Sequence, residues 1–452
     1  MKTQEKSPPT GRSPILRHRP RRKSRPATPR QADPIEVRVE RFGARGDGIA
    51  RGPEGPLYIP DTVPGDRVIV LPGATRGDGR AATLREVLES GPGRVAPPCK
   101  HADRCGGCTL QHASGDLIAA MKRDQLAEAL ARKGLPTDNV APTVSVPAGS
   151  RRRLRLSALR VAAGTVLGFN ERASGKVIDV RECPVARREL TDLFPALRDL
   201  IGGLDCLGRG ADVQVTLSDT GVEILLIPTG GGDPSLDERQ DLVDFAERHD
   251  IARIGWETDG IAEPLVARRT PRTVFAGVPV DLPIGGFLQP SLEGQEILTR
   301  LVLQGVPDDA PTVADLYAGC GSFAVPLSKR GANVVAVEGS EAAVAALRRG
   351  AAGLRLQAEC RDLARDPLGV TELNRFQAVV FDPPRAGAAA QAETLAQSAV
   401  PRIVAVSCNP ATLARDLRSL VDGGYTLDSA VPVDQFTWSG HVEAVAVLSR
   451  PG

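Results

Sequence analysis

Cys408 is the residue whose setting most favours chemistry. Ile403 to Val406 form a short apolar run, which is typical of a strand buried on both faces of a parallel sheet. From Pro410 onward the apolar residues recur at helical spacing, so a helix begins there. Cys408 therefore lies on a strand-to-helix turn at the carboxyl edge of a sheet, where open α/β sheets bind ligands. A lone cysteine is otherwise most often a small buried hydrophobic residue.

Glycines and acidic residues end other predicted strands. The run 312–316 ends at Tyr317 and the sequence AGCGS, and the run 333–337 ends at Glu338. Glycines let the backbone approach a ligand, and an acid after the second strand can accept both ribose hydroxyls of an adenosyl cofactor. Asp362 follows the sequence LQAECR and could meet the adenine amine, and the strand 376–381 ends at Asp382.

The adenosyl cofactor is either a dinucleotide or a methyl donor. NAD requires a third glycine in the glycine loop, and Ala324 stands at that position. Three predicted strand ends meet at one crevice, and the glycine loop there lacks the third glycine of an NAD site. The pattern therefore favours S-adenosylmethionine over NAD.

A methyl donor gives Cys408 a specific chemical role. Carbon 5 of a pyrimidine is a poor nucleophile, but thiolate addition at carbon 6 produces an enolate whose carbon 5 attacks the methyl sulfonium. The proton on carbon 5 must then leave before the thiolate is expelled, so a base is required. Glu443, directly before an apolar strand, is our candidate, and His441 is the rival.

The loop at residues 382–385 helps to distinguish among the possible methyl acceptors. Asp382, Pro383, Pro384 and Arg385 resemble the loop of amino-group methyltransferases, but those enzymes stack the base on an aromatic fourth residue, where this chain has arginine. Cytosine methylation of RNA commonly adds a second cysteine after the loop proline, and the sequence PRAG has none. Uracil is the favoured target.

Clustered cysteines predict a metal site. Cys99, Cys105 and Cys108 have the spacing C-x5-C-x2-C, and Cys183 supplies a fourth thiol. Four thiolates suit zinc or an iron–sulfur cluster. Structural zinc sites usually come as two close pairs, whereas Cys183 is single, so we favour a 4Fe-4S cluster and keep zinc as the alternative.

Length and charge set the organisation of the chain. With 452 residues it is long enough for several domains, and its 57 basic and 55 acidic residues nearly balance. Residues 1–33 are rich in Lys, Arg and Pro, which predicts a disordered basic arm. The sequence shows neither a secretory signal nor a membrane-spanning run. We expect a cytoplasmic protein, with no membrane partner and no obligate protein partner.

The remaining patterns predict a multidomain α/β protein. Short alternating runs separated by glycines predict an OB-like β-barrel over residues 34–90. Residues 91–270 read as a mixed α/β central domain that carries the cysteine cluster, with a helix at 117–133. In it the run RRRLR at 151–155 enters a strand, and alternation puts Arg153 and Arg155 on one face, a candidate phosphate contact. Residues 271–452 read as a Rossmann-like domain that binds S-adenosylmethionine.

Together these motifs resemble the uracil-5 RNA methyltransferases, and within them the iron–sulfur branch that acts on 23S rRNA and carries a TRAM domain, an RNA-binding barrel. The resemblance covers residues 34–452 and is most specific in CKHADRCGGC, DLYAGCGSFAVPL, DPPRAG, VSCNPATLARDL and GHVEAV.

The resemblance implies roles for individual residues. Cys408 would be the nucleophile and Glu443 the base. The residues that would contact the donor or the target ring are Gln289, Tyr317, Glu338, Asp362 and Asp382. The residues that would hold the 4Fe-4S cluster are Cys99, Cys105, Cys108 and Cys183. The partner would be RNA, with 23S rRNA preferred over tRNA, and a non-catalytic RNA-binding assembly factor is the third possibility.

Overall fold

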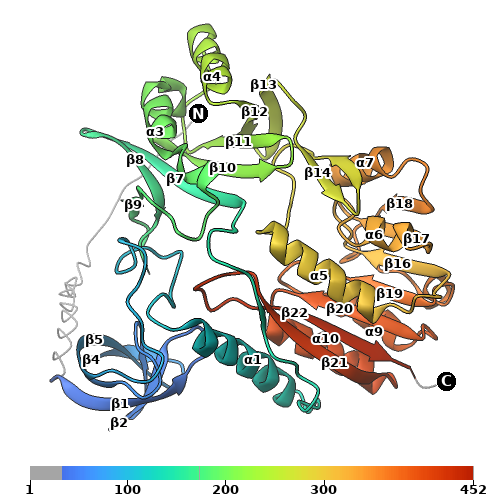
Figure 1. Cartoon of the computed structure of the whole chain (residues 1–452), viewed down its shortest axis with the longest axis horizontal. Helices are drawn as coiled ribbons and strands as arrows, with labels where there is room; N and C mark the ends of the chain where they lie inside the picture. Colours follow the sequence, from blue (N-terminus) through green and yellow to red (C-terminus); the bar gives the residue numbers. More distant parts are fainter. Residues whose placement is uncertain (1–32, 173, 451–452) are drawn as a thin grey trace, which may run out of the picture.

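The computed structural model describes residues 33–172 and 174–450. The predicted basic arm lies outside the described residues, except for Asp33. The chain builds a barrel, a central mixed sheet and a C-terminal sheet layered with helices, which appear in Figure 1 in blue, green and orange to red. This arrangement confirms the predicted multidomain α/β fold.

The N-terminal unit is a closed barrel of five short strands in the order β1-β2-β3-β5-β4. The strands are β1 (Ile35–Phe42), β2 (Gly48–Gly52), β3 (Gly55–Ile59), β4 (Arg67–Arg76) and β5 (Gly79–Glu89). Alternate residues such as Val39, Leu57 and Val68 point inward and form its core. Closure leaves no free strand edge, as the alternating pattern predicted.

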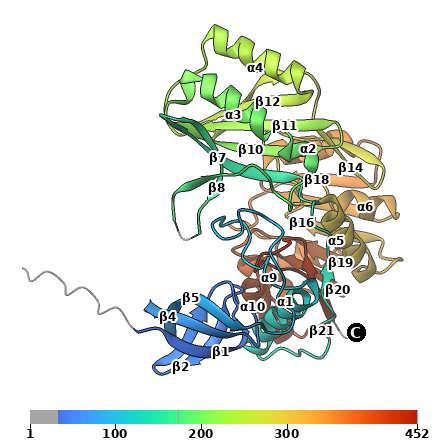
Figure 2. The same ribbon diagram turned by 60° about the vertical axis from the view of Figure 1, so that its left-hand side comes forward.

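The central unit is a seven-stranded sheet in the order β13-β12-β11-β10-β7-β8-β9. Its strands are β7 (Arg153–Val161), β8 (Gly164–Asn170), β9 (Val177–Asp179), β10 (Gly210–Ser218), β11 (Gly221–Pro228), β12 (Ile251–Thr258) and β13 (Ile261–Ala267). The helices α3 (Phe194–Gly203) and α4 (Leu236–Arg248) contact this sheet and lie at the top of Figure 2, where the barrel lies at the bottom. Their apolar residues complete its core.

The C-terminal sheet has the order β18-β17-β16-β19-β20-β22-β21-β6. Its strands are β16 (Thr312–Leu316), β17 (Asn333–Glu338), β18 (Leu356–Cys360), β19 (Ala378–Phe381), β20 (Arg402–Ser407), β21 (Thr426–Asp434), β22 (Glu443–Ser449) and β6 (Val144–Ser145). The five strands β16 to β20 are parallel, and β22 is antiparallel to its neighbours. Strand order reverses between β16 and β19, and in such sheets that switch point opens the ligand crevice.

Helices cover both faces of the C-terminal sheet. One face packs against α5 (Leu292–Gly305), α6 (Ala324–Lys329) and α7 (Glu341–Gly350). The other packs against α9 (Ala389–Ala396), α10 (Pro410–Asp422) and α1 (Gly115–Ala131). Helix α1 corresponds to the predicted helix 117–133, and it lies between the barrel and β21 in Figure 1. A segment from the first half of the chain thus completes the C-terminal layer.

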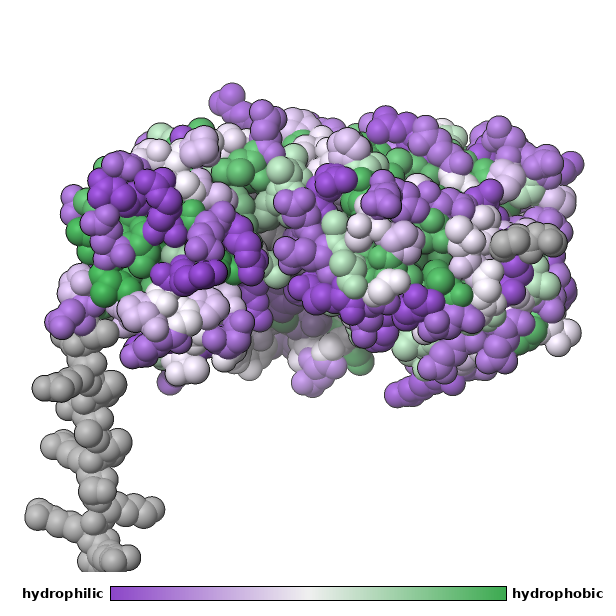
Figure 3. Space-filling model, turned by 90° about the horizontal axis from the view of Figure 1, so that it is seen from below, coloured by the Kyte–Doolittle hydropathy of each residue, from purple (hydrophilic) through white to green (hydrophobic). Residues whose placement is uncertain are grey.

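The surface is of mixed hydropathy on the face seen from below. There, hydrophilic residues surround separate apolar areas (Figure 3). No helix within the described ranges is both long enough and apolar enough to cross a membrane.

Candidate active site

Cys408 and Glu443 meet at neighbouring strand ends. Strand β20 stops at Ser407, and α10 begins at Pro410, where the Asn409 side chain accepts a hydrogen bond from the backbone N–H of Ala411 at 3.1 Å. The turn thus has the predicted form. In the ladder, Ser407 pairs with Ala444, so Cys408 and Glu443 are the next residue on each strand. Tertiary structure has brought the two predicted catalytic residues to one edge.

A chain of hydrogen bonds joins the buried Glu443 to the half-buried Asp382 through two glutamines. Gln435 Nε2 donates to Glu443 Oε2 at 2.8 Å and to Gln289 Oε1 at 3.0 Å. Gln289 Nε2 in turn donates to Asp382 Oδ2 at 3.3 Å. Gln289 and Asp382 were predicted site residues, whereas Gln435 was not. No periodicity or motif at residues 434–437 distinguishes Gln435 from an ordinary loop residue.

Burial controls the protonation of this group. It raises the pKa of Glu443 to about 8, and the nearby Asp382 acts in the same direction. Burial also raises the pKa of Asp382. The pKa of the Cys408 thiol is raised first by burial and then by Glu443 and Asp382, while Arg385 lowers it. The site therefore holds protons near neutral pH and can exchange them with a substrate.

The glycine loop beside β16 is open to a ligand. Gly319 has a φ of +55°, and a Cβ added there would meet nothing within 4 Å. Tyr317 also has a positive φ, of 61°, which is uncommon for a residue with a side chain. Glu338, at the end of β17, accepts hydrogen bonds from the backbone N–H groups of Gly319 at 2.9 Å and Ser340 at 2.8 Å. These residues form a cradle at the switch point of the sheet.

Asp315 is a buried acid in the strand that leads into this cradle. The side chain is fully buried in β16, and neither carboxylate oxygen has a hydrogen-bond partner among the described residues. Burial raises its pKa well above the ordinary value, and Asp382 and Glu338 add to the effect. A buried ionised carboxylate without a partner is costly, so burial favours the protonated form. Sequence reasoning overlooked Asp315, although an acid four residues before Gly319 in the glycine loop was a usable signal.

Asp362 lies further out than the other predicted donor residues. It follows β18, is exposed, and accepts a hydrogen bond from the backbone N–H of Ala364 at 3.0 Å. The backbone N–H of Arg361 donates to Glu338 O at 2.9 Å, which ties the ends of β17 and β18 together. Asp362 and Glu338 therefore occupy adjacent strand ends on the outer side of the cradle.

The arginine run at 151–155 is partly buried. Arg152 is 4% exposed, so it cannot contact a phosphate. Its guanidinium donates to Gln289 O at 3.1 Å and Gln295 Oε1 at 2.8 Å. Arg153 stacks over Phe287 at 5.4 Å, and only Arg155 stays well exposed. Arg152 therefore fixes the segment that carries Gln289, whereas Arg153 and Arg155 lie on the strand face predicted to contact phosphate.

The four predicted metal-binding cysteines line one cavity of about 490 Å³. Cys408, Arg385, Phe436 and His441 line the same cavity, so the four cysteines border Cys408. His101 lines it too, whereas His112 is buried with Nε2 3.2 Å from Thr62 O.

The donor set fits a thiolate-bound group. The backbone N–H groups of His101 and Gly107 donate to the sulfur atoms of Cys99 and Cys105, each at 3.4 Å. Burial raises the pKa of Cys183, while backbone N–H groups of Val185 and Ala186 lower it. Such N–H groups stabilise thiolate ligands. In the described ranges, no three His, Cys, Asp or Glu side chains are already drawn together as ligands of a single ion.

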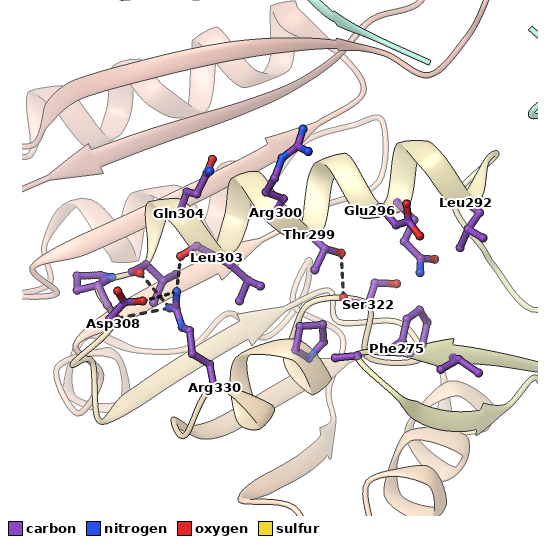
Figure 4. Close-up of a pocket in the computed structure, with 16 residues that line it drawn as sticks. Phe275, Leu292, Glu296, Thr299, Arg300, Leu303, Gln304, Asp308, Ser322 and Arg330 are labelled. Atoms are coloured by element: carbon purple, nitrogen blue, oxygen red, sulfur yellow. Dashed lines mark hydrogen bonds and ion pairs between the residues drawn. The ribbon is translucent and has the colours of Figure 1, made fainter. Parts of the chain in front are cut away.

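A second cavity, of about 800 Å³, lies away from Cys408 and Glu443. It separates α5 from the loop that contains Ser322, as Figure 4 shows. At one end of this cavity, the Arg330 guanidinium donates to Val306 O at 2.9 Å and to Asp308 Oδ1 at 3.1 Å. Its positive charge therefore lies beside the C-terminal end of α5. None of the predicted catalytic residues lines this cavity.

Comparison with known proteins identifies the family. Residues 357–451 match the family model described as tRNA (Uracil-5-)-methyltransferase. An uncharacterized RNA methyltransferase of Mesorhizobium japonicum is 42% identical over 419 residues, covering 91% of this chain and 97% of the relative. A 23S rRNA (uracil(1939)-C(5))-methyltransferase of an Azoarcus species is 33% identical, covering 91% of this chain and 99% of the relative. The chain belongs to the RNA (uracil-5-)-methyltransferase family.

The methyltransferase is also similar to a solved structure over most of its length. The tRNA (uracil-54, C5)-methyltransferase of Pyrococcus abyssi, in complex with S-adenosyl-L-homocysteine, is 27% identical with a TM-score of 0.72. The match covers 91% of this chain and 99% of that one. The methyltransferase therefore uses S-adenosylmethionine as its donor and acts on carbon 5 of uracil in RNA.

Proposed function

We propose that this methyltransferase modifies a uridine of 23S rRNA through a covalent bond between Cys408 and carbon 6 of the ring. The observation that carries the mechanism is the position of Cys408 and Glu443 as facing neighbours of β20 and β22 beside the donor cradle. The relative of 33% identity named as a 23S rRNA enzyme supports the choice of RNA, as does the cysteine cluster.

The reaction follows from these positions. The Cys408 thiolate adds to carbon 6, and the electrons of the ring double bond move toward the carbonyl and make carbon 5 nucleophilic. When bound, S-adenosylmethionine supplies an electrophilic methyl group to carbon 5. Glu443 then takes the proton from carbon 5, the electron pair of that C–H bond restores the double bond, and the sulfur–carbon bond breaks to return the thiolate.

The other predicted residues would hold the reactants. Glu338 would accept ribose hydroxyls, Tyr317 would line the glycine loop, and Asp362 would meet the adenine. Asp382 and Gln289 face Glu443 through Gln435 and would contact the target ring. In this division, residues 34–90 form a TRAM-like RNA-binding barrel, residues 91–270 the central domain and residues 271–452 the methyltransferase domain.

Cys99, Cys105, Cys108 and Cys183 would hold a 4Fe-4S cluster, with zinc as the alternative. The reaction is redox-neutral, so the group has no electron to supply. A structural role is supported by the hydrogen bonds next to Cys108, where the backbone N–H groups of Thr109 and Leu110 donate to Trp438 O at 2.9 and 3.0 Å. Trp438 belongs to the loop between Gln435 and Glu443, so the cysteine segment holds the loop before the base.

RNA that contains 5-fluorouridine tests the proposal, since fluorine at carbon 5 cannot leave as a proton and the enzyme stays attached. We would incubate such 23S rRNA fragments and tRNA separately with S-adenosylmethionine and separate the products on a denaturing gel. The matched variants are Cys408→Ala and Cys206→Ala, the latter a half-buried cysteine of the central domain.

The expected result is a shifted band with 23S rRNA from wild type and Cys206→Ala, but not from Cys408→Ala. A shift with tRNA alone would move the substrate to tRNA, for which the Pyrococcus abyssi enzyme is the precedent. Protein that binds the donor but gives no band with either RNA would overturn the covalent mechanism on these substrates and favour an RNA-binding assembly role.

A further inference from the structure

We propose that Gln435 is a positioning residue for proton abstraction, which holds Glu443 through one carboxylate oxygen and couples it to Gln289 and Asp382. This inference rests on the proposed covalent mechanism. It concerns only the last step, in which the base removes the proton from carbon 5 and the product is released.

The direction of the hydrogen bonds is set by the groups at the two ends. In the ionised form that acts as the base, Glu443 can only accept, so Gln435 must present its NH₂ group toward it, as Gln289 does toward Asp382. Gln435 uses both N–H bonds, one to Glu443 Oε2 at 2.8 Å and one to Gln289 Oε1 at 3.0 Å. A rotated amide would place its carbonyl oxygen against the carboxylate, which is repulsive. The amide therefore has one favourable orientation.

Close packing prevents water from replacing Gln435. The residue is 4% exposed, and Glu443 is 3% exposed. A Cβ at Gly294, in the first turn of α5, would come within 2.6 Å of Gln435 Oε1, so the amide lies directly against the helix backbone. That oxygen has no hydrogen-bond partner among the described residues. The site accepts this unsatisfied atom while the NH₂ group serves both neighbours.

The segment that carries Gln435 is fixed on both sides. Before it, Asp434 forms an ion pair with the fully buried Lys122 of α1. After it, Phe436 O accepts a hydrogen bond from Lys122 Nζ at 3.2 Å, and Trp438 O is held by the cysteine segment. Gln435 is thus held in place by contacts that do not involve Glu443.

This geometry assigns separate roles to the two carboxylate oxygens of Glu443. Oε2 is held by Gln435, so Oε1 is the oxygen left to take the proton from carbon 5. The titratable groups that interact with the carboxylate are Asp382 and Cys408; Arg385 acts on Cys408, and His441 lies two residues before Glu443. Without Gln435, the carboxylate loses the amide that donates to it and can rotate away from the ring. Addition of the Cys408 thiolate and methyl transfer precede this step and do not involve the proton on carbon 5.

The test separates release from adduct formation. We would follow a single turnover with ordinary 23S rRNA and labelled S-adenosylmethionine, and measure both the methylated RNA bound covalently to protein in SDS and the free methylated RNA. The variants are Gln435→Met, which keeps the shape without the amide, and Gln435→Asn, which withdraws the amide by one methylene. Gln391→Met is the matched control, because Gln391 is fully buried but bonds Leu368 and Thr394 far from the site.

We expect Gln435→Met and Gln435→Asn to release product about 10- to 100-fold more slowly, the loss of a hydrogen bond to a charged group. The covalent methylated complex should accumulate in both variants but not in wild type or Gln391→Met. With 5-fluorouridine RNA, where no release occurs, all four proteins should form the adduct at similar rates.

Two results would overturn the role of Gln435. One is release at the wild-type rate from a folded Gln435→Asn protein. The other is equally slow adduct formation on 5-fluorouridine RNA, which would place the defect before proton abstraction. If wild type itself forms no adduct, the proposed function fails instead, and that outcome is read from the wild-type lane alone.

Discussion

Replacing Lys122 by methionine should loosen the contact between α1 and the loop that carries Gln435, by an amount that depends on pH. Lys122 is fully buried, and its ion-pair partner Asp434 is 8% exposed. Burial lowers the pKa of Lys122, and the charge of Asp434 opposes that shift. Methionine fills a similar volume without a charge, so the variant leaves a buried carboxylate alone.

The loss in free energy of unfolding can be bounded. Removing one member of a buried ion pair typically costs about 3–5 kcal/mol. A buried carboxylate without its partner avoids this penalty by binding a proton. For an aspartic acid with an ordinary pKa, this protonation costs about 4 kcal/mol at pH 7 and about 1.5 kcal/mol at pH 5. The folded variant then keeps a proton that the unfolded chain releases. Its loss of stability should therefore grow by about 1.4 kcal/mol for each pH unit between these values.

Urea unfolding at both pH values measures this dependence. The chain has two tryptophans, and a Trp256→Phe background leaves Trp438, in the affected loop, as the only tryptophan reporter. The double variant Lys122→Met with Asp434→Asn removes both charges and should recover most of the loss at pH 7. Equal destabilisation of the single variant at pH 5 and pH 7, or no recovery in the double variant, would refute the reasoning.

Further predictions concern the reaction, the donor and the cysteine cluster. Methylation at saturating RNA should rise between about pH 6.5 and 8.5, because the pKa of Glu443 is raised to about 8 and only the ionised carboxylate is a base; a flat initial-rate profile would contradict this. Asp315→Asn should weaken binding of S-adenosylmethionine about tenfold, because the buried carboxylate has no hydrogen-bond partner among the described residues. Binding of S-adenosylhomocysteine, which lacks the sulfonium charge, should weaken about twofold at most. Calorimetry measures both affinities, and equal losses would count against a charge effect. Cys183→Ala should remove iron and visible absorbance from protein purified without oxygen, whereas Cys206→Ala keeps both; zinc in the elemental analysis of wild type would establish the alternative metal.

Local sequence determined the elements that hold the site. The apolar run before Cys408 and the helical spacing after it fix a strand, a turn and a helix, because these depend on residues close in the chain. The same holds for the glycine loop after β16 and for the alternating strands of the barrel. These patterns also placed Glu443 at the beginning of a strand, where its charge made it conspicuous.

Tertiary structure alone decided how distant segments complete the site. Gln435 has no local signal, and it matters only because the pairing of β21 with β22 brings it beside Glu443, while α5 packs against it. The arginine run looked like a phosphate contact, since charge is usually exposed, yet Arg152 is buried because Gln289 O and Gln295 Oε1 satisfy its guanidinium. Lys122 likewise lies 312 positions before its ion-pair partner Asp434 in the sequence. Such pairings depend on the docking of whole units, which periodicity along one segment cannot specify.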